Sequence, residues 1–230
     1  MKRFWKEARV TPVEGGHAVE LDGRPVRTPG RQLLAVPHPR LAAAIAAEWG
    51  AVAEEIDPRA MPLTGLANAA IERISPARAA FAAGLAAYGE SDLLCYRAEG
   101  PLPLVVRQAE QWDPLLDWAR ARYDAHFVLA SGIMHKPQPA ATLARLHEAI
   151  AARTAFELAG LSPIVTLTGS LVAALALIEG AASAEVIWAA AQLDEDWQAE
   201  QWGQDDLAVK TRAAHTAEFE GAARFLTLLD

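Results

Sequence analysis

Residues 19–26 read VELDGRPV, and this stretch decides that the chain begins with β-structure. Its apolar residues alternate with polar ones and are interrupted by Asp22-Gly23. Asp-Gly between two such runs favours a two-residue hairpin turn, because both turn positions need a positive φ. Pro25 has no N–H to donate to a neighbouring strand, so we expect the second arm of the hairpin at a sheet edge.

The β-pattern extends on both sides of this hairpin and then stops. Residues 4–10 and 32–36 are further strand candidates, and prolines punctuate the first forty residues. After Pro39 apolar residues recur at helical spacing from Leu41 to Val52, which predicts a helix that ends before Pro58.

Most of the remaining chain has a helical pattern. The other helices that we expect span residues 64–74, 76–88, 104–123, 140–153, 162–179, 183–202 and 206–228. Ser75 should cap the second of these, with Pro76 at the first helical position. Two short strand-like runs, 92–97 and 126–130, interrupt the helices.

Strands followed by helices predict an α+β fold. We expect a small β-rich N-terminal domain with one helix over residues 1–65 and a larger all-α helical domain over residues 66–230.

Bulk composition excludes several classes of protein. The chain has 230 residues, of which 52% are hydrophobic, so it is globular rather than disordered. Its net charge of -8 argues against a nucleic-acid partner. The single cysteine, Cys95, rules out a disulfide within the chain and fits a reducing compartment. Polar residues interrupt the most apolar window, 161–180, so we expect a buried helix there and no membrane insertion.

The signatures of common active sites are missing. The sequence contains no Gly-rich dinucleotide fingerprint, no phosphate-binding loop and no nucleophile elbow. No two histidines stand four residues apart, and no Cys-x-x-Cys occurs, so zinc spacing is absent. Cys95 lies in an apolar run, where we expect a buried side chain rather than a reactive thiolate. We therefore expect no catalytic residue, no cofactor and no metal.

The segment 181–209 stands out because it contains no basic residue and three tryptophans, Trp188, Trp197 and Trp202. Its acids are Glu185, Asp194, Glu195, Asp196, Glu200, Asp205 and Asp206. On one continuous helix, a turn of about 100° per residue gives two opposite stripes. The expected core stripe consists of Val186, Ala190, Leu193 and Trp197. The opposite stripe consists of Trp188, Glu195 and Trp202, bordered by Gln192, Gln198 and Ala199.

Three interpretations of the second stripe remain open. A further helix could cover it, with Glu195 satisfied inside the protein. It could instead bind a partner, because exposed aromatic rings are good anchors and a carboxylate between them selects a cationic group. Paired-carboxylate catalysis by the run 194–196 is the third, although adjacent helical residues do not face each other.

Seven strings, in order along nearly the whole chain, resemble the family of chaperones for the alpha subunit of the F-type ATP synthase. They are residues 3–6 (RFWK), 21–29 (LDGRPVRTP), 47–49 (AEW), 61–64 (MPLT), 92–97 (DLLCYR), 112–116 (WDPLL) and 193–203, with Glu195, Gln198, Trp202 and Gly203 as fixed points of the last. Each string is weak alone, but their order and spacing are specific.

This resemblance implies a chaperone without catalytic residues or cofactors, which binds the unassembled alpha subunit of the catalytic head and prevents its aggregation. The family's acidic C-terminal motif falls on Glu195 and Asp206, although a glutamate is expected after Gly203, where this chain has Gln204. The residues expected to bind the partner are Glu195, Gln198, Trp202, Trp188 and Asp206.

Two other functions stay open. One is a small soluble hydrolase that uses acidic residues of the helical domain, and the other is a helical adaptor for an unrelated protein. No apolar segment follows the first residues, so we expect no secretory signal and a bacterial cytoplasmic location, whereas mitochondrial relatives carry a targeting peptide.

Overall fold

The computed structural model describes residues 2–132 and 134–230, which form two compact units. The first unit comprises Met1–Arg78, Thr154–Gly160 and Gly221–Asp230, and the second comprises Ala79–Arg153 and Leu161–Glu220. The expected α+β class, with a small β-rich N-terminal region followed by a larger helical part, is confirmed. The domain boundary between residues 65 and 66 stays a prediction.

The first unit contains a small antiparallel sheet built on the predicted hairpin. Its strands are β1 (Ala8–Val13), β2 (Gly16–Leu21), β3 (Arg24–Pro25) and β4 (Ala35–Val36). β2 pairs with β1 along its whole length and with β3 and β4 at different residues. Asp22 and Gly23 have φ values of 48° and 78°, as the hairpin turn requires. Among the described strands β3 pairs only with β2, so Pro25 lies at an edge, as predicted.

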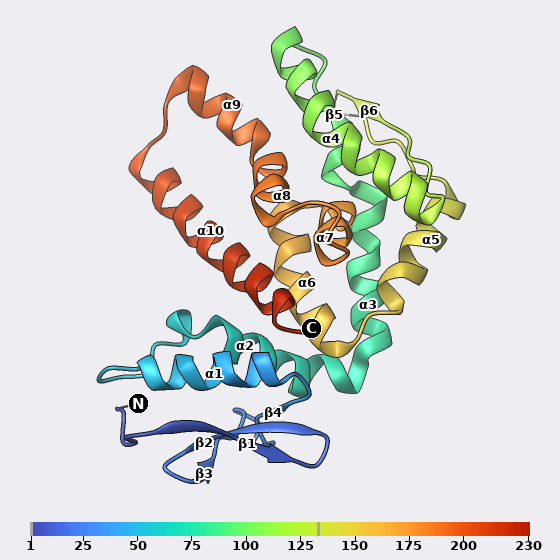
Figure 1. Cartoon of the computed structure of the whole chain (residues 1–230). Coiled ribbons are helices and arrows are strands. Elements are labelled where there is room, and N and C mark those ends of the chain that lie inside the picture. The colour runs from blue at the N-terminus through green and yellow to red at the C-terminus, as the bar shows by residue number, and fades with distance from the viewer. Residues whose placement is uncertain (1, 133) are drawn as a thin grey trace. The chain divides into compact units, whose positions relative to one another are not determined.

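Helix α1 (Pro39–Ala51) packs along this sheet (Figure 1). Its residue Glu48 caps the next helix, α2 (Pro62–Ala69), because its carboxylate accepts hydrogen bonds from the backbone N–H groups of Leu63 and Thr64, both 2.8 Å long. Two of the family-like strings, 47–49 and 61–64, are therefore in contact, and their contact caps α2.

Trp49, at the end of α1, also supports the first unit. Its ring meets that of Trp5 edge-on, with centroids 5.3 Å apart. The indole N–H of Trp5 donates to the carbonyl of Trp49 at 3.1 Å. These contacts assign Trp49 to packing within its own unit.

The expected helix start at Ser75 is wrong. The helical backbone continues from α2 through turns at Ala70–Ile74 and Ser75–Ala77 into α3 (Arg78–Ala86). Ser75 has a φ of -52° and a ψ of -46°, which are helical values, so its side chain does not cap a new helix.

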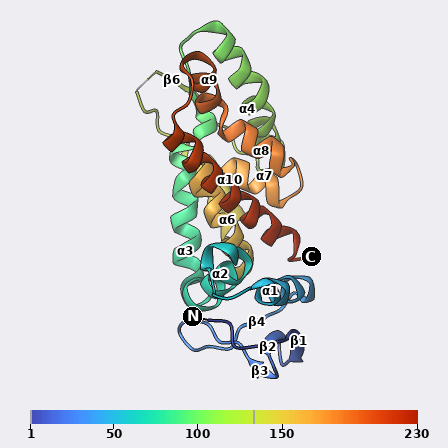
Figure 2. The same ribbon diagram turned by 90° about the vertical axis from the view of Figure 1, so that its left-hand side faces the viewer.

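Helix α4 (Leu102–Tyr123) organises the second unit. The side chains of Trp112, Leu115, Leu116 and Ala119 lie on one face of this helix and are buried. The helices that pack on α4 are α5 (Ala140–Ala151), α7 (Leu171–Ile178), α8 (Ala184–Ala191) and α9 (Leu193–Trp202). Helices α6 (Ala155–Thr168) and α10 (Asp206–Thr227) each contribute residues to both units, and the second unit also contains a two-residue parallel pair, β5 (Tyr96–Arg97) with β6 (Ala130–Ser131). Figure 2 shows the same helices from the side.

The helix expected over residues 162–179 is in fact two. α6 begins earlier, at Ala155, and ends at Thr168. Gly169 then adopts a φ of 64°, which favours glycine and ends a helix. Ser170 starts α7, because its hydroxyl accepts a 2.9 Å hydrogen bond from the N–H of Ala173.

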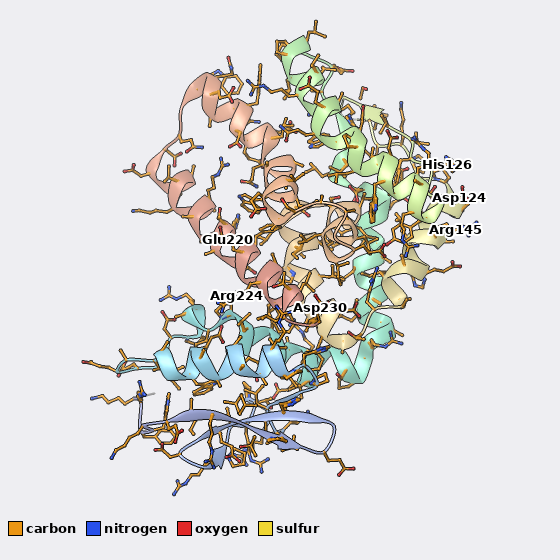
Figure 3. The ribbon with its side chains drawn as sticks, in the orientation of Figure 1. Asp124, His126, Arg145, Glu220, Arg224 and Asp230 are labelled. Atoms are coloured by element: carbon orange, nitrogen blue, oxygen red, sulfur yellow. The ribbon has the colours of Figure 1, made fainter. Side chains whose placement is uncertain are left out.

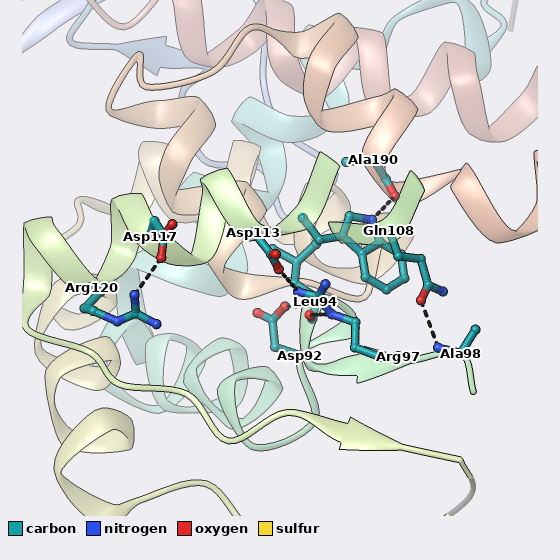
Figure 4. Close-up of polar contacts among 10 residues, drawn as sticks. Asp92, Leu94, Arg97, Ala98, Gln108, Asp113, Asp117, Arg120 and Ala190 are labelled. Carbon is teal, nitrogen blue, oxygen red and sulfur yellow. Dashed lines mark hydrogen bonds and ion pairs between the residues drawn. The ribbon is translucent and has the colours of Figure 1, made fainter. Parts of the chain in front are cut away.

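The strand-like run 92–97 holds three parts of the second unit together (Figure 4). The buried carboxylate of Asp92 accepts hydrogen bonds from Leu94, at 3.1 Å, and from Val172 at the start of α7, at 3.0 Å. The guanidinium of Arg97 pairs with Asp113 at 2.7 Å and lies 5.3 Å from the ring centroid of Trp112. The family-like strings 92–97 and 112–116 are therefore in contact through Arg97 and Asp113. The hydrogen bonds of Asp92 show that its side chain supports the fold.

The far end of α4 is closed by Asp124, whose φ is 56°. Its carboxylate lies 3.1 Å from the imidazole of His126 and 3.5 Å from the guanidinium of Arg145 on α5 (Figure 3). Across the described residues, no helix is both long enough and apolar enough to span a bilayer.

Candidate partner-binding site

Three of the residues expected to bind the partner lie together on α9. Glu195, Gln198 and Trp202 line a hollow of about 740 Å³ that lies between α9 and the first turns of α10. The rest of its lining consists of Leu167, Gln192, Ala199, Gly203, Gln204, Asp205, Leu207, Ala208, Thr211, Arg212 and His215. We call this the first hollow.

A second hollow, of about 520 Å³, lies on the other side of α9. Its lining comes from residues 96–101, from Leu104 and Gln108 of α4, and from Gly132, Asp194, Trp197, Gln198 and Trp202. Because Gln198 and Trp202 line both hollows, α9 forms a ridge between them. We call it the α9 ridge.

Contacts with α4 hold one side of the ridge. Arg107 forms an ion pair of 2.8 Å with Glu200, and its guanidinium lies 5.0 Å from the ring centroid of Trp197. The side-chain amide of Gln108, also on α4, donates a 2.8 Å hydrogen bond to Asp194, which lies one turn before Trp197 on α9. Both contacts join α9 to α4.

The acids of α9 differ sharply in their partners. Asp196 pairs with Arg212 of α10, while Asp194 and Glu200 are engaged by α4. Glu195 is exposed, and among the described residues it forms no hydrogen bond and no ion pair. Its charge adds a smaller contribution to the raised pKa of Arg212, whose main cause is the hydrogen bond to Asp196. Glu195 is therefore the carboxylate of the α9 ridge that is available to an external cation.

Apolar side chains surround this carboxylate. Trp202 is 79% exposed and is the last residue of α9, because Gly203 turns the chain away with a φ of 79°. Leu207, at the start of α10, is 74% exposed and lines the first hollow. Exposed large side chains around a free carboxylate are typical of protein-binding surfaces rather than of a solvated helix face.

The position of Trp188 differs from the prediction. Its side chain is half-buried and its ring centroid lies 4.8 Å from that of Phe219 on α10, so it does not share an exposed face with Glu195 and Trp202. The cause is a break at Gln192, where α8 ends and α9 begins. Val186, placed in the core by the continuous-helix pattern, is 52% exposed for the same reason.

The break has a signal in the sequence that periodicity does not capture. Asp194, Glu195 and Asp196 stand together in the first turn of α9. Acids favour a helix N-terminus because they interact with the positive end of the helix dipole. A run of three acids inside an expected helix therefore indicates a second helix start.

Asp206 lies outside both hollows. It is the exposed first residue of α10, whereas its neighbour Asp205 caps that helix by accepting a 2.7 Å hydrogen bond from the N–H of Ala208. Of the partner-binding residues chosen from the sequence, the structure thus groups Glu195, Gln198 and Trp202 and separates Trp188 and Asp206. Leu207, Arg212 and His215 also line the first hollow, and no local motif marks them.

The site has no arrangement suited to bond-making chemistry. The carboxylates of Asp194 and Asp196 turn to α4 and α10, so they do not converge on one substrate. Burial raises the pKa of the Cys95 thiol to about 12, which keeps it protonated. Within the described residues, no cluster of three or more His, Cys, Asp and Glu side chains has an arrangement that could hold a metal ion.

Comparison with known proteins shows the family of the chain. The profile of the ATP12 chaperone protein family matches residues 2–120. The chain belongs to the ATP12 chaperone family. A mitochondrial atp12 protein of Schizosaccharomyces pombe is 25% identical over 216 residues, which cover 88% of this chain and 74% of the yeast protein.

Solved structures of the ATP12 family agree over the whole chain. Atp12 from Paracoccus denitrificans, and an aspartate-to-lysine mutant of it, are 45% identical, with a TM-score of 0.95 over 100% of this chain and 98% of theirs. A chaperone-like protein from Agrobacterium tumefaciens is 42% identical, with the same TM-score, over 100% of this chain and 86% of its own. This ATP12-family protein is an ATP synthase assembly chaperone and not an enzyme, so the hydrolase alternative is wrong.

Proposed function

We propose that this chaperone binds the unassembled alpha subunit of the ATP synthase catalytic head, and that the α9 ridge is its contact surface. The family assignment implies an ATP synthase subunit as partner. The alpha subunit is the client that the seven sequence strings indicate. The observation that carries the site is the exposed carboxylate of Glu195 in the first hollow, which has no hydrogen bond and no ion pair among the described residues.

The physical reason for such a chaperone lies in the client. A lone alpha subunit exposes the apolar interface that it later shares with the beta subunit, and patches of this kind aggregate. Covering the patch lowers the concentration of exposed apolar surface. The chaperone must also release its client, so the interface should combine a few strong anchors with polar contacts.

The α9 ridge has this combination. Trp202 offers a large ring that loses little conformational entropy on binding, and Gln198 beside it offers a donor and an acceptor. Glu195 supplies a charge that an Arg or Lys of the client would neutralise. We propose that these three side chains present to the client a surface like that of the beta subunit.

Capture of purified alpha subunit by the tagged chaperone tests the proposal. Glu195→Lys replaces the free carboxylate by a cation, so capture should fall about tenfold or more, as is usual when an interfacial charge is reversed. Glu218→Lys is the matched control, because Glu218 is exposed on the neighbouring helix α10 and has no hydrogen bond or ion pair among the described residues. Both variants should unfold at the same temperature as the wild type.

Equal capture by Glu195→Lys and by the wild type would remove the α9 ridge from the proposal. Recovery of an unrelated protein, and no alpha subunit, from the native host would remove the client itself. The bacterial cytoplasm is the compartment that we propose for this function, since a single buried cysteine needs no oxidising environment.

A further inference from the structure

The second unit carries an apolar groove apart from the two hollows. It lies between α4 and the segment 181–189 and has a volume of about 540 Å³. Its lining consists of Glu110, Gln111, Pro114, Leu115, Trp118, Ala181, Ala182, Ser183, Val186 and Ala189. We call it the α4–α8 groove.

The walls of this groove are fixed by the core beneath them. The indole N–H of Trp112 donates a buried 2.8 Å hydrogen bond to the carbonyl of Ala190, which joins α4 to α8 (Figure 4). Leu115 forms part of the floor and is 5% exposed, whereas Val186 is 52% exposed. A ligand would therefore meet a preformed site and lose little free energy in ordering it.

The groove also carries uncompensated polar groups. Glu110 has no hydrogen bond and no ion pair through its side chain among the described residues. Pro114, one turn later, has no N–H to donate to the carbonyl of Glu110, so this part of α4 offers an extra backbone acceptor. A free carboxylate and an acceptor above apolar walls match a cationic donor attached to an apolar group.

Within the part of the chain that the structure describes, no cation pairs with Glu110. The arginines of α4 are engaged elsewhere: Arg107 by Glu200, Arg120 by Asp117 and Arg122 by Glu179. On the other wall, the segment 181–189 contains no basic residue. Glu185 there adds a negative charge, and a hydrogen bond with Ser183 lowers its pKa. The potential at the groove is therefore negative.

The groove lies next to the α9 ridge along α4. Gln108 lines the second hollow and Pro114 lines the groove. A rise of about 1.5 Å per residue separates them by about 9 Å along the helix axis. An extended segment of about three residues is as long as this axial separation.

We propose that the α4–α8 groove is a second client subsite, which takes an apolar side chain of the alpha subunit next to an Arg or Lys. This inference rests on the proposed function and deepens it. The apolar side chain packs against Leu115, Trp118 and Val186, and the cation pairs with Glu110. The α9 ridge and the groove then bind neighbouring parts of one client segment.

Binding of purified alpha subunit to the full-length chaperone tests the subsite, with the dissociation constant measured at low and at high salt. Val186→Asp places a charge on the apolar wall and should weaken binding about tenfold. Helix α8 should tolerate it, because Val186 lies in the first turn, where an acid is favourable. Val128→Asp is the matched control, because Val128 is also exposed but lies outside the groove.

Glu110→Lys isolates the charge. It should weaken binding about tenfold at low salt and less at high salt, because salt screens exposed charges. Glu218→Lys serves again as control and should bind like the wild type.

The results separate the two proposals. If Glu195→Lys loses the client while Val186→Asp and Glu110→Lys bind like the wild type, the groove subsite is overturned and the proposed function stands. If the wild type itself binds no alpha subunit, the proposed function falls and the subsite falls with it. Weakening by both groove variants, with both controls unaffected, supports the subsite.

Discussion

The guanidinium of Arg107 donates to both carboxylate oxygens of Glu200, at 2.8 Å each. This bifurcated contact from one guanidinium nitrogen joins α4 to the last turn of α9, and the ring of Trp197, one turn earlier, also lies against the guanidinium. The α9 ridge is therefore held in place by a side chain that itself lines neither hollow. A fixed ridge presents its anchors with little loss of entropy on binding.

Loss of this contact should loosen the ridge. In Arg107→Ala, we expect faster amide hydrogen exchange in α9, because the ion pair and the cation–π contact disappear together. Hydrogen exchange with peptide-level mass spectrometry measures this. Arg120→Ala removes an ion pair within α4 that holds no other helix, so α9 should exchange there as in the wild type. Unchanged exchange of α9 in Arg107→Ala would show that the ridge is held by other contacts.

Because Trp202 is exposed, its replacement should affect binding of the client and leave the stability of the fold unchanged. Trp202→Ser should weaken binding of the alpha subunit by about 2 kcal/mol or more, as expected of an aromatic anchor. Its melting temperature should stay unchanged, since the side chain is 79% exposed. Met134→Ser, at a residue 72% exposed, is the control for loss of an exposed apolar side chain. A large drop in melting temperature for Trp202→Ser would assign this tryptophan to the fold instead.

Asp92 gives stability a pH dependence that can be assigned to one group. Burial raises its pKa to about 6 from the ordinary value of 3.8, although hydrogen bonds from Val172 and other groups oppose the shift. Between these two values the unfolded chain releases the Asp92 proton and the folded chain keeps it. The contribution of Asp92 to the free energy of unfolding is therefore complete below the lower value and falls by about 3 kcal/mol as the pH rises through the window.

Urea unfolding of the wild type and of Asp92→Asn, from pH 4 to pH 7, measures this contribution. The asparagine cannot ionise, so the stability advantage of the wild type should be largest at pH 4 and should shrink up to pH 6. A difference that grows with pH would mean that the helix N–H groups dominate over burial. Asp92→Ala should be less stable than the wild type by about 2 kcal/mol, because two buried N–H groups lose their acceptor.

The hydroxyl of Tyr123 reports on the acid at the end of α7. Burial raises its pKa to about 12, and its hydrogen bond to Glu179, 2.6 Å long, adds to the shift. In Glu179→Gln this phenol should ionise at a lower pH, because the negative charge beside it is gone. An ultraviolet titration checks this, with Tyr123→Phe subtracted to isolate one tyrosine of three. An unchanged titration would show that burial alone sets the pKa.

Local chemistry explains which parts of the fold could be predicted from the sequence. Asp22-Gly23 readily adopts the positive φ values that a two-residue hairpin turn needs, and Pro25 has no N–H for a second neighbouring strand, so the hairpin and the edge position follow directly. The breaks at Gly169 and Gln192 were missed, because apolar periodicity continues across both of them. Gly169-Ser170 and the acid run 194–196 carry the signals that mark the new helices.

Only part of the candidate site can be predicted from the sequence, because contacts with other helices decide which side chains stay free. Sequence spacing and resemblance indicated Glu195 and Trp202, but spacing does not tell which acid of α9 is free. That depends on Gln108, Arg107 and Arg212, which lie on α4 and α10 and take up the other acids. The continuous-helix pattern places Trp188 on the same face as Glu195 and Trp202, but the helix changes direction at Gln192, so side chains before this residue point elsewhere.

Aggregation of the purified alpha subunit, followed by light scattering on dilution from denaturant, tests the central claim most directly. The wild-type chaperone at about equal molar ratio should suppress scattering, and Glu218→Lys should do the same. Glu195→Lys should leave most of the scattering, although it folds normally. Equal suppression by all three proteins would contradict the account, because the free carboxylate of the α9 ridge would then have no part in holding the client.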